Sequence, residues 1–233
     1  MASSPDQAAQ AGQMQPSTMK GWLHSSAGIP RKVLKFSTDI PIPASVHATD
    51  VLVKVSHAAL NPGSSIIMQL CPMIFRTKPS IPEMDFSGTV VRTGPKVPVS
   101  RELIPGTAIF GSVPVSQHVA SGKGALAEVV VVPAESVCLK PDNMPSDQAA
   151  GLPTAGVTAL ALLDCVKLKA GYKVLVNGAS GGIGSMVVQM AKNSVGESGR
   201  VVGICSGKNL EMVKGLGADE VRLPISFEPV HVC

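Results

Sequence analysis

The sequence predicts an α/β protein in which a β-rich first part precedes a parallel sheet that carries a nucleotide-binding turn. Three observations lead to this prediction. Short valine-rich runs, interrupted by proline and glycine, occupy residues 19–142. The composition changes near Pro145 to segments rich in alanine and leucine. A glycine-rich turn then follows an apolar run inside the stretch VLVNGASGGIGSMVVQMAK, residues 174–192.

The composition is that of a folded chain. Of the 233 residues, 45% are hydrophobic and 15% are charged, which favours a real core over disorder. The net charge of +4 is small and its basic residues are scattered, so we expect no nucleic-acid partner. The longest uncharged run near the middle, residues 148–163, is shorter than the ~20 residues of a membrane span, so we expect no membrane partner.

The chain ends and the cysteines indicate a cytoplasmic location. Residues 1–18 are polar and contain no apolar core of a secretory signal, so we expect a disordered tail. The five cysteines are dispersed and include no C-x-x-C pair, which argues against a structural zinc site and fits a reducing compartment.

The elements before the glycine turn are predicted from local patterns. The runs 51–55, 87–92 and 125–132 are expected to form antiparallel strands of a barrel or sandwich. Ser146 is expected to cap a helix that begins at Asp147, and a second helix is expected over residues 155–166. The run 172–177 shows no alternation, which predicts a strand of a parallel sheet covered on both faces.

Residues 172–205 have the order of one βαβ unit. After the first strand and the glycine turn comes a predicted helix, whose apolar face is expected to be Ile183, Met186, Val187 and Met190. Residues 200–205 supply a second strand. Glycine permits a tight turn and lets backbone N–H groups and the helix dipole reach a pyrophosphate. The predicted cofactor-binding residues of this turn are Gly178, Ala179, Ser180, Gly181, Gly182, Ile183 and Gly184.

The end of the second strand predicts which dinucleotide binds. An NAD site usually has an acidic residue there, which binds the ribose hydroxyls. The segment CSGKN, residues 205–209, has none before Glu211. Ser206 and Asn209 can donate hydrogen bonds and Lys208 adds positive charge, a set that suits a 2′-phosphate and predicts NADP(H). The alternative is that Lys208 is a solvated loop lysine.

Two dehydrogenase families have turns like NGASGGIG. The turn is similar to the T-G-x-x-x-G-I-G turn of short-chain dehydrogenases, which need a downstream Tyr-x-x-x-Lys pair. The chain has one tyrosine, Tyr172, and it precedes the glycines, so that chemistry is excluded.

A second family accounts for motifs along residues 19–221. The chain resembles the medium-chain dehydrogenase/reductase superfamily, in its zinc-free quinone-oxidoreductase-like (zeta-crystallin-like) branch. NPGS resembles its Asn-Pro loop, PEMDFSGTVV its Pro-Gly-x-Asp-Phe-x-Gly-x-Val segment, and GALAEVVVVPAESV its Gly-x-Ala-Glu-Tyr strand. AAGLPTAGVTAL is similar to the Ala-Ala-x-x-Pro-x-x-x-x-Thr-Ala helix, and LGADEV completes the set. These five segments are residues 61–64, 82–91, 124–137, 149–160 and 216–221.

The resemblance implies a domain order and an incomplete second domain. It implies a GroES-like β-barrel over residues 19–142 and a Rossmann domain over residues 143–221, followed by a divergent tail, residues 222–233. Relatives in this family continue further, whereas two strands and GADEV are expected here. We therefore expect a C-terminally truncated chain, from splicing or a faulty gene model, that folds poorly or binds NADPH weakly.

The resemblance also implies a reaction. Asn61 stands near the first zinc-binding cysteine of related alcohol dehydrogenases, and Asp85 stands where their Gly-His-Glu segment has its glutamate, so we expect no metal. The implied reaction is hydride transfer from NADPH to a quinone or an α,β-unsaturated carbonyl. A non-catalytic remnant or binding module with an incomplete nucleotide site is the alternative.

Two catalytic candidates follow from the resemblance alone. Thr158 would hydrogen-bond near the nicotinamide, and Asn61 would lie near the cofactor or the substrate carbonyl. A buried helix threonine and a loop Asx-turn are the alternatives. Asp85 is as well explained by structure as by catalysis. The implied partner is a small-molecule substrate, and a homodimer is the candidate assembly.

Overall fold

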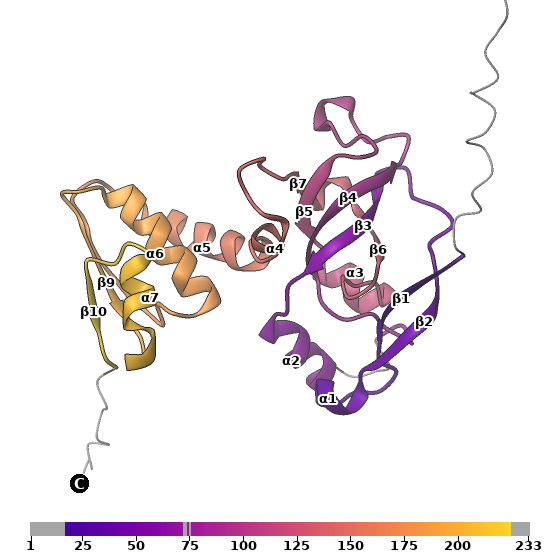
Figure 1. The fold of residues 1–233 in the computed structure, drawn as a ribbon, viewed down its shortest axis with the longest axis horizontal. Helices are drawn as coiled ribbons and strands as arrows, with labels where there is room; N and C mark the ends of the chain where they lie inside the picture. The colour runs from indigo at the N-terminus through magenta and orange to yellow at the C-terminus, as the bar shows by residue number, and fades with distance from the viewer. Residues whose placement is uncertain (1–16, 72–73, 75, 225–233) are drawn as a thin grey trace, which may run out of the picture. The chain divides into compact units, whose positions relative to one another are not determined.

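The computed structural model describes residues 17–71, 74 and 76–224. The chain divides into two compact units, Met1–Gly151 and Leu152–Cys233, which are described separately here (Figure 1). The predicted N-terminal tail, apart from its last two residues, and residues 225–233 of the predicted divergent tail lie outside the described residues. The predicted domain boundaries stay predictions. Among the described helices, none combines the length and apolar character that crossing a membrane requires.

The first unit is built on a five-stranded antiparallel sheet. Its strand order is β6-β3-β4-β5-β7, and β1 pairs with β2 in a separate two-stranded sheet. Valine, isoleucine and phenylalanine on the inward positions form its core, in which Val53, Phe86 and Ile109 are fully buried. The strands are β1 (Thr18–Leu23), β2 (Lys35–Pro41), β3 (Asp50–Ala58), β4 (Asp85–Thr93), β5 (Ala108–Ser112), β6 (Val129–Pro133) and β7 (Val137–Leu139).

The predicted strands over 51–55 and 87–92 are confirmed, and the prediction over 125–132 is only half right. Residues 129–133 form β6, whereas the preceding residues bond to two different segments. Ala125 N–H donates to Glu83 O, Leu126 N–H donates to Pro82 O, and Leu126 O accepts from Trp22 N–H. Because these backbone groups serve two segments, they cannot continue one ladder.

Helices and short 3₁₀ turns connect the strands of the first unit. They are α1 (Pro30–Val33), α2 (Pro62–Leu70), η3 (Val99–Arg101), α3 (Val115–Ser121), η4 (Ala134–Ser136) and α4 (Ser146–Ala150). The prediction that Ser146 caps a helix is wrong. Pro145, with extended backbone, occupies the N-cap position, and Ser146 is already the first helical residue. Its carbonyl instead accepts a hydrogen bond from the Ser87 hydroxyl at 2.6 Å.

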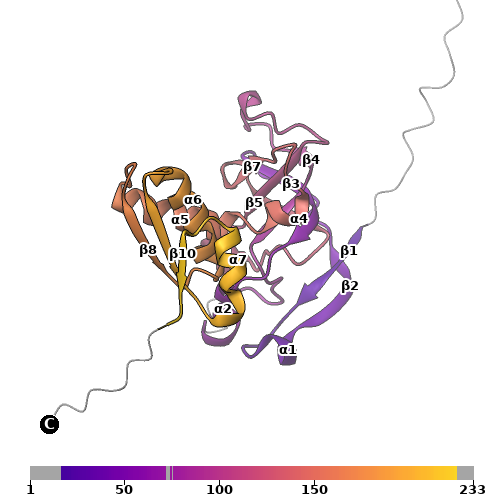
Figure 2. The ribbon, with the colours of Figure 1, turned by 60° about the vertical axis from the view of Figure 1, so that its left-hand side comes forward.

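The second unit contains the predicted βαβ arrangement and one strand more than predicted. Its parallel sheet has the order β10-β9-β8, in which Glu220–Arg222 pairs in register with Val202–Ile204 (Figure 2). The two-strand expectation was wrong because this third strand is only three residues long. The elements are α5 (Pro153–Val166), β8 (Lys173–Asn177), α6 (Gly182–Val195), β9 (Arg200–Ile204), η5 (Gly207–Asn209), α7 (Leu210–Gly215) and β10 (Glu220–Arg222).

The buried face of helix α6 is rotated from the predicted one and shares only Val187 with it, which packs partly against the core. Its buried residues are Val188, Ala191 and Val195, whereas Ile183 is 41% exposed. The reason is Gly184, which lies one turn before Val188 on the same face. A Cβ atom at Gly184 would stand 2.1 Å from Gly178 O, so the helix approaches the turn more closely than any side chain permits.

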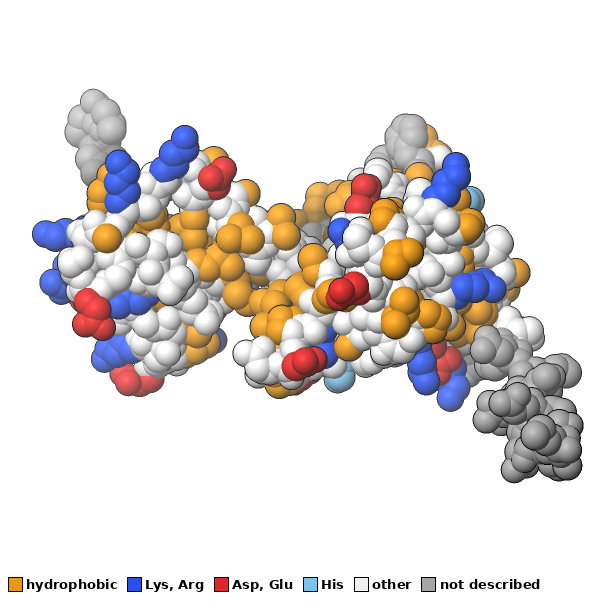
Figure 3. All heavy atoms as spheres, turned by 90° about the horizontal axis from the view of Figure 1, so that it is seen from above, with side chains coloured by type: hydrophobic (Ala, Val, Ile, Leu, Met, Phe, Trp, Pro, Cys, Tyr) orange, Lys and Arg blue, Asp and Glu red, His pale blue; other side chains and the backbone are white. Residues whose placement is uncertain are grey.

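The described residues cover one face of this sheet. Val176 on β8 and Val201 on β9 are buried in a cluster with α6 and α7. Leu175, which points to the opposite face, is 63% exposed, so cover on both faces is not observed within the described ranges. Apolar side chains are visible at the surface of this unit in Figure 3. Val157, Leu160 and Leu162 of α5 are more than half exposed.

We predict that Gly184→Ala destabilises the second unit by about 1–3 kcal/mol, because the new methyl group would overlap Gly178 O. Urea unfolding of the two proteins measures this difference. Gly182→Ala is the matched control, since a Cβ atom there would meet nothing within 4 Å. Equal stability of the two variants would contradict the proposed tight contact.

Candidate cofactor and substrate site

The glycine turn is held at the carboxyl ends of two parallel strands. Gly178, directly after β8, has a φ of +72°, a left-handed conformation that glycine adopts without strain. Ala179 is fully buried, and its N–H donates to Ile204 O at the end of β9 (3.0 Å). Gly181 is the N-cap residue of α6, and its N–H donates to Gly178 O (2.9 Å). The turn therefore has one fixed position relative to β9.

The N-terminus of α6 offers backbone donors, and the space at its first residue is open. Gly182, Ile183 and Gly184 are its first residues, whose N–H groups lack partners within a helix, and the first turn contains no acidic side chain. The positive end of the helix dipole adds to these donors. The free space at Gly182 lets a ligand approach the backbone. These features fit a dinucleotide pyrophosphate.

The loop after β9 lies against the turn. Asn209 Nδ2 donates to Ser180 Oγ (3.0 Å) and to Ser206 Oγ (3.2 Å). Lys208 between them is exposed. The next acidic residue, Glu211, forms an ion pair with Lys214 (3.1 Å) and is 87% exposed. The structure thus brings together Ser180, Ser206 and Asn209, and these bonds include no carboxylate.

Sequence reasoning assigned these residues singly and missed their connection. Parallel strands place their carboxyl ends at one edge of a sheet, so the segments after β8 and β9 had to be neighbours. That rule would have indicated the contact between Ser180 and Asn209, although not its hydrogen bonds.

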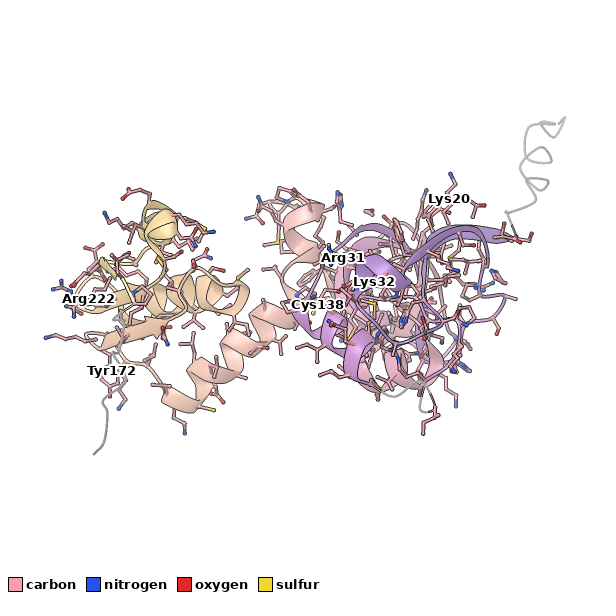
Figure 4. The ribbon with its side chains drawn as sticks, turned by 90° about the horizontal axis from the view of Figure 1, so that it is seen from below. Lys20, Arg31, Lys32, Cys138, Tyr172 and Arg222 are labelled. Carbon is pink, nitrogen blue, oxygen red and sulfur yellow. The ribbon has the colours of Figure 1, made fainter. Side chains whose placement is uncertain are left out.

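Thr158 and Tyr172 lie elsewhere in the second unit. The Thr158 hydroxyl donates to Thr154 O (2.7 Å) one turn earlier in α5, as helical threonines often do. Its predicted role at the nicotinamide stays a prediction. Tyr172 lies immediately before β8 (Figure 4), at the opposite end of that strand from the glycine turn. It therefore cannot take the position of a proton donor beside the turn.

Asn61 lies in the first unit, where two carboxylates hold it. It is the N-cap residue of α2, but its side chain does not cap the helix. Instead, Asn61 Nδ2 donates to Asp85 Oδ2 (3.1 Å), and its backbone N–H donates to Glu83 Oε2 (2.9 Å). Asp85 is 1% exposed and Glu83 is 5% exposed. The Asp85 carboxylate therefore orients the side chain of Asn61, the predicted catalytic residue.

Glu83 is a buried acid that sequence reasoning missed. Burial raises the pKa of its carboxyl group, the nearby Asp85 charge raises it further, and the Asn61 N–H and the Ser64 hydroxyl act in the opposite direction. The Ser64 hydroxyl stands close enough to influence this charge, but Ser64 Oγ makes no hydrogen bond of normal geometry within the described residues. Glu83 also has a left-handed backbone, with a φ of 64°.

A signal for Glu83 was present in the motif. In PEMDFSG it stands where the family pattern Pro-Gly-x-Asp-Phe has glycine, the residue that tolerates positive φ. Counting the matches to a motif does not reveal that the one mismatch places a glutamate where the backbone favours glycine. Elsewhere, no group of three or more His, Cys, Asp or Glu side chains in the described ranges is placed to hold a metal ion.

A second buried polar cluster in the first unit is structural. Arg76 donates to His24 Nε2 (2.9 Å), and His118 Nδ1 contacts Lys123 O (2.7 Å). Burial lowers the pKa of both histidines, and the Arg76 charge lowers them further. The hydrogen bonds of the two rings with the Ser26 and Lys123 carbonyls raise the pKa in the opposite direction, so both histidines are held by backbone contacts as well as by packing.

We predict that the free energy of unfolding of Glu83→Gln increases relative to that of the parent chain as pH rises. The folded-state pKa of Glu83 lies above its unfolded value, so its contribution is complete below the unfolded pKa and is lost as pH rises through the folded pKa. Glutamine does not titrate. The free energy of unfolding, measured between about pH 5 and about pH 8, tests this.

Glu102→Gln is the matched control for that experiment. Glu102 has a similar left-handed backbone, with a φ of 54°, but it is exposed. This control separates the effect of burying the carboxyl group from the effect of placing an amide side chain on a left-handed backbone. A gap for Glu83→Gln that is independent of pH would refute the shifted pKa.

Comparisons with known proteins cover both units. The alcohol dehydrogenase GroES-like domain family matches residues 47–142. The trans-enoyl reductase poxH of Penicillium oxalicum is 30% identical over 92% of this chain and 63% of its own length. The chloroplastic NADPH-dependent alkenal/one oxidoreductase of Arabidopsis thaliana is 36% identical over 88% of this chain and 52% of its own length.

A solved structure of a quinone oxidoreductase is similar to this chain over both units. The quinone oxidoreductase from Coxiella burnetii superposes with a TM-score of 0.75 and 30% identity, over 88% of this chain and 62% of that one. The chain thus spans between 52% and 63% of the length of these relatives. The predicted fold class, a GroES-like domain followed by part of a Rossmann domain, is confirmed. Motifs, fold and relatives agree across both units: residues 47–142 match the alcohol dehydrogenase GroES-like domain family, and the chain as a whole is similar to quinone-oxidoreductase-like members of the medium-chain dehydrogenase/reductase superfamily.

Proposed function

We propose that the chain is an NADPH-dependent oxidoreductase that reduces a quinone or an α,β-unsaturated carbonyl without zinc. The observation that carries this proposal is the glycine turn at the start of α6, linked by Asn209 to a loop that contains Lys208 and no carboxylate. The relatives support the substrate class, because they are named as a trans-enoyl reductase, an alkenal/one oxidoreductase and a quinone oxidoreductase.

The residues present fit NADP(H). The α6 N-terminus would hold the pyrophosphate through backbone N–H groups. Ser206, Lys208 and Asn209 would surround the 2′-phosphate, and the Arabidopsis relative is named for NADPH dependence. An NAD site usually presents an acid here. Ser180, Ser206 and Asn209 instead form a network of hydroxyl and amide groups.

The proposal of a zinc-free reaction rests on the ligand types. Asn61 occupies the region of the first zinc-binding cysteine, and Asp85, which takes the place of the glutamate in Gly-His-Glu, already accepts from Asn61 Nδ2. Zinc prefers thiolate and imidazole ligands, and Asn61 offers an amide. A quinone or enone is already polarised, so positioning and a hydrogen bond to the developing enolate oxygen suffice.

Each predicted catalytic residue then has a defined task. When bound, the reduced nicotinamide would supply the hydride. Asn61 keeps one amide N–H and its Oδ1 available within the described residues, because the other N–H is given to Asp85. Thr158 keeps acceptor capacity on its hydroxyl oxygen while its hydrogen is given to Thr154. The homodimer and the cytoplasmic location stay predictions.

We predict that NADPH raises the melting temperature of the purified chain more than NADH does. A ligand that binds only the folded state stabilises it by about 2.7 kcal/mol at a concentration of 100 times its Kd. Thermal unfolding with each dinucleotide measures this, and NADPH oxidation with a quinone or an enone then tests turnover.

The outcomes separate the candidate functions. Selective stabilisation by NADPH together with turnover supports the reductase. Selective stabilisation without turnover favours the binding module. A melting temperature that neither dinucleotide changes would rule out a working nucleotide site in this chain.

A further inference from the structure

The amide of Asn209 joins two segments that are far apart in sequence. Asn209 lies in η5, after β9, and its Nδ2 donates to Ser206 Oγ in the same loop (3.2 Å). The same Nδ2 donates to Ser180 Oγ in the glycine turn (3.0 Å), which precedes it by 29 residues. Its backbone N–H donates to Ser206 O (2.9 Å), which fixes the loop from which the amide extends. Both amide hydrogens are therefore used inside the protein.

The direction of these two bonds determines what the serines can offer. A serine hydroxyl has one hydrogen to donate and two lone pairs that accept. Asn209 occupies a lone pair on each serine and leaves each hydroxyl hydrogen available. Neither hydrogen has a protein acceptor within the described ranges. Ser206 is exposed and Ser180 is half-buried, so both hydroxyls are accessible to a ligand.

Such a pair of donors suits a phosphate monoester. A phosphate dianion accepts hydrogen bonds through all its terminal oxygens, and bonds to a charged acceptor are stronger than neutral ones. A ribose 2′-hydroxyl is best bound by a carboxylate, which accepts its hydrogen. Here the ammonium group of Lys208 is exposed in the same loop and forms no ion pair within the described residues. The combination therefore favours an anion over a hydroxyl.

We propose that Asn209 is a positioning residue that sets the Ser180 and Ser206 hydroxyls as hydrogen-bond donors to the 2′-phosphate of the dinucleotide. It thereby determines the preference for a 2′-phosphorylated ligand without contacting that ligand. This inference rests on the proposed function, and it changes the role of Asn209 from direct phosphate contact to support of two other groups. Selectivity here depends on the direction of hydrogen bonds as well as on the charge of Lys208.

Calorimetric binding to the purified chain tests this with four ligands. NADPH and NADH differ in the 2′-phosphate, and adenosine 2′,5′-bisphosphate and AMP differ in the same group without a nicotinamide. We expect Asn209→Ala to weaken binding of the two 2′-phosphorylated ligands on the order of tenfold and to leave NADH and AMP unchanged. A merely structural role would weaken all four ligands alike.

Asn209→Asp reverses the direction of the hydrogen bonds with almost no change of shape. Its carboxylate would accept both hydroxyl hydrogens and add a negative charge, so the loss for the 2′-phosphorylated ligands should exceed that of Asn209→Ala. Asn193→Ala is the matched control, because Asn193 is an exposed asparagine on α6 of the same unit. Its four affinities should equal those of the parent chain.

The results distinguish this inference from the function on which it rests. If the parent chain prefers NADPH and both Asn209 variants keep that preference, the positioning role is wrong while the proposed function stands. If the parent chain binds none of the four ligands, the proposed function fails and this inference fails with it. Loss of preference in both variants, with melting temperatures unchanged, supports the role.

Discussion

The arrangement of the second unit depends on the contact between Gly184 and Gly178. The carbonyl of Gly178 fills the space that a side chain at Gly184 would need, so α6 starts directly against the turn. That close approach keeps Ala179 buried and its N–H on Ile204 O, which in turn places Ser180 beside the loop after β9. The nucleotide binding proposed for this edge thus depends on two glycines that have no functional groups of their own.

Patterns of large side chains predicted much of the fold, but they did not predict the features that depend on small residues such as glycine and alanine. Valine runs indicated β3 and β4, and the order of strand, turn, helix and strand indicated the βαβ unit. The apolar face of α6 was misassigned because Gly184 and Ala191, which lie on the buried side, add little to a hydrophobic pattern. Strand β10 was missed because three residues carry no periodicity and form a strand only by pairing with β9.

The sequence identified residues of the candidate site, but it did not predict the contacts between them. Motif comparison pointed to Asn61, Asp85 and the glycine turn, but it could not show that Asn61 gives an amide N–H to Asp85. Glu83 is held in place by Ala125, whose N–H donates to Glu83 O from a segment far along the chain. Such contacts depend on how distant strands pack, and a linear motif contains no record of that packing.

Leu175 has a consequence for how this protein behaves in concentrated solution. It sits in the middle of β8, which is the last strand on one side of the described sheet, and it is 63% exposed. An apolar edge strand is a template on which other chains can add strands. Lys173 and Asn177, both exposed, lie two residues to either side of Leu175 and oppose that addition with charge and polarity. The charged and polar neighbours of Leu175 on this face therefore limit the strand addition that an apolar edge would otherwise invite.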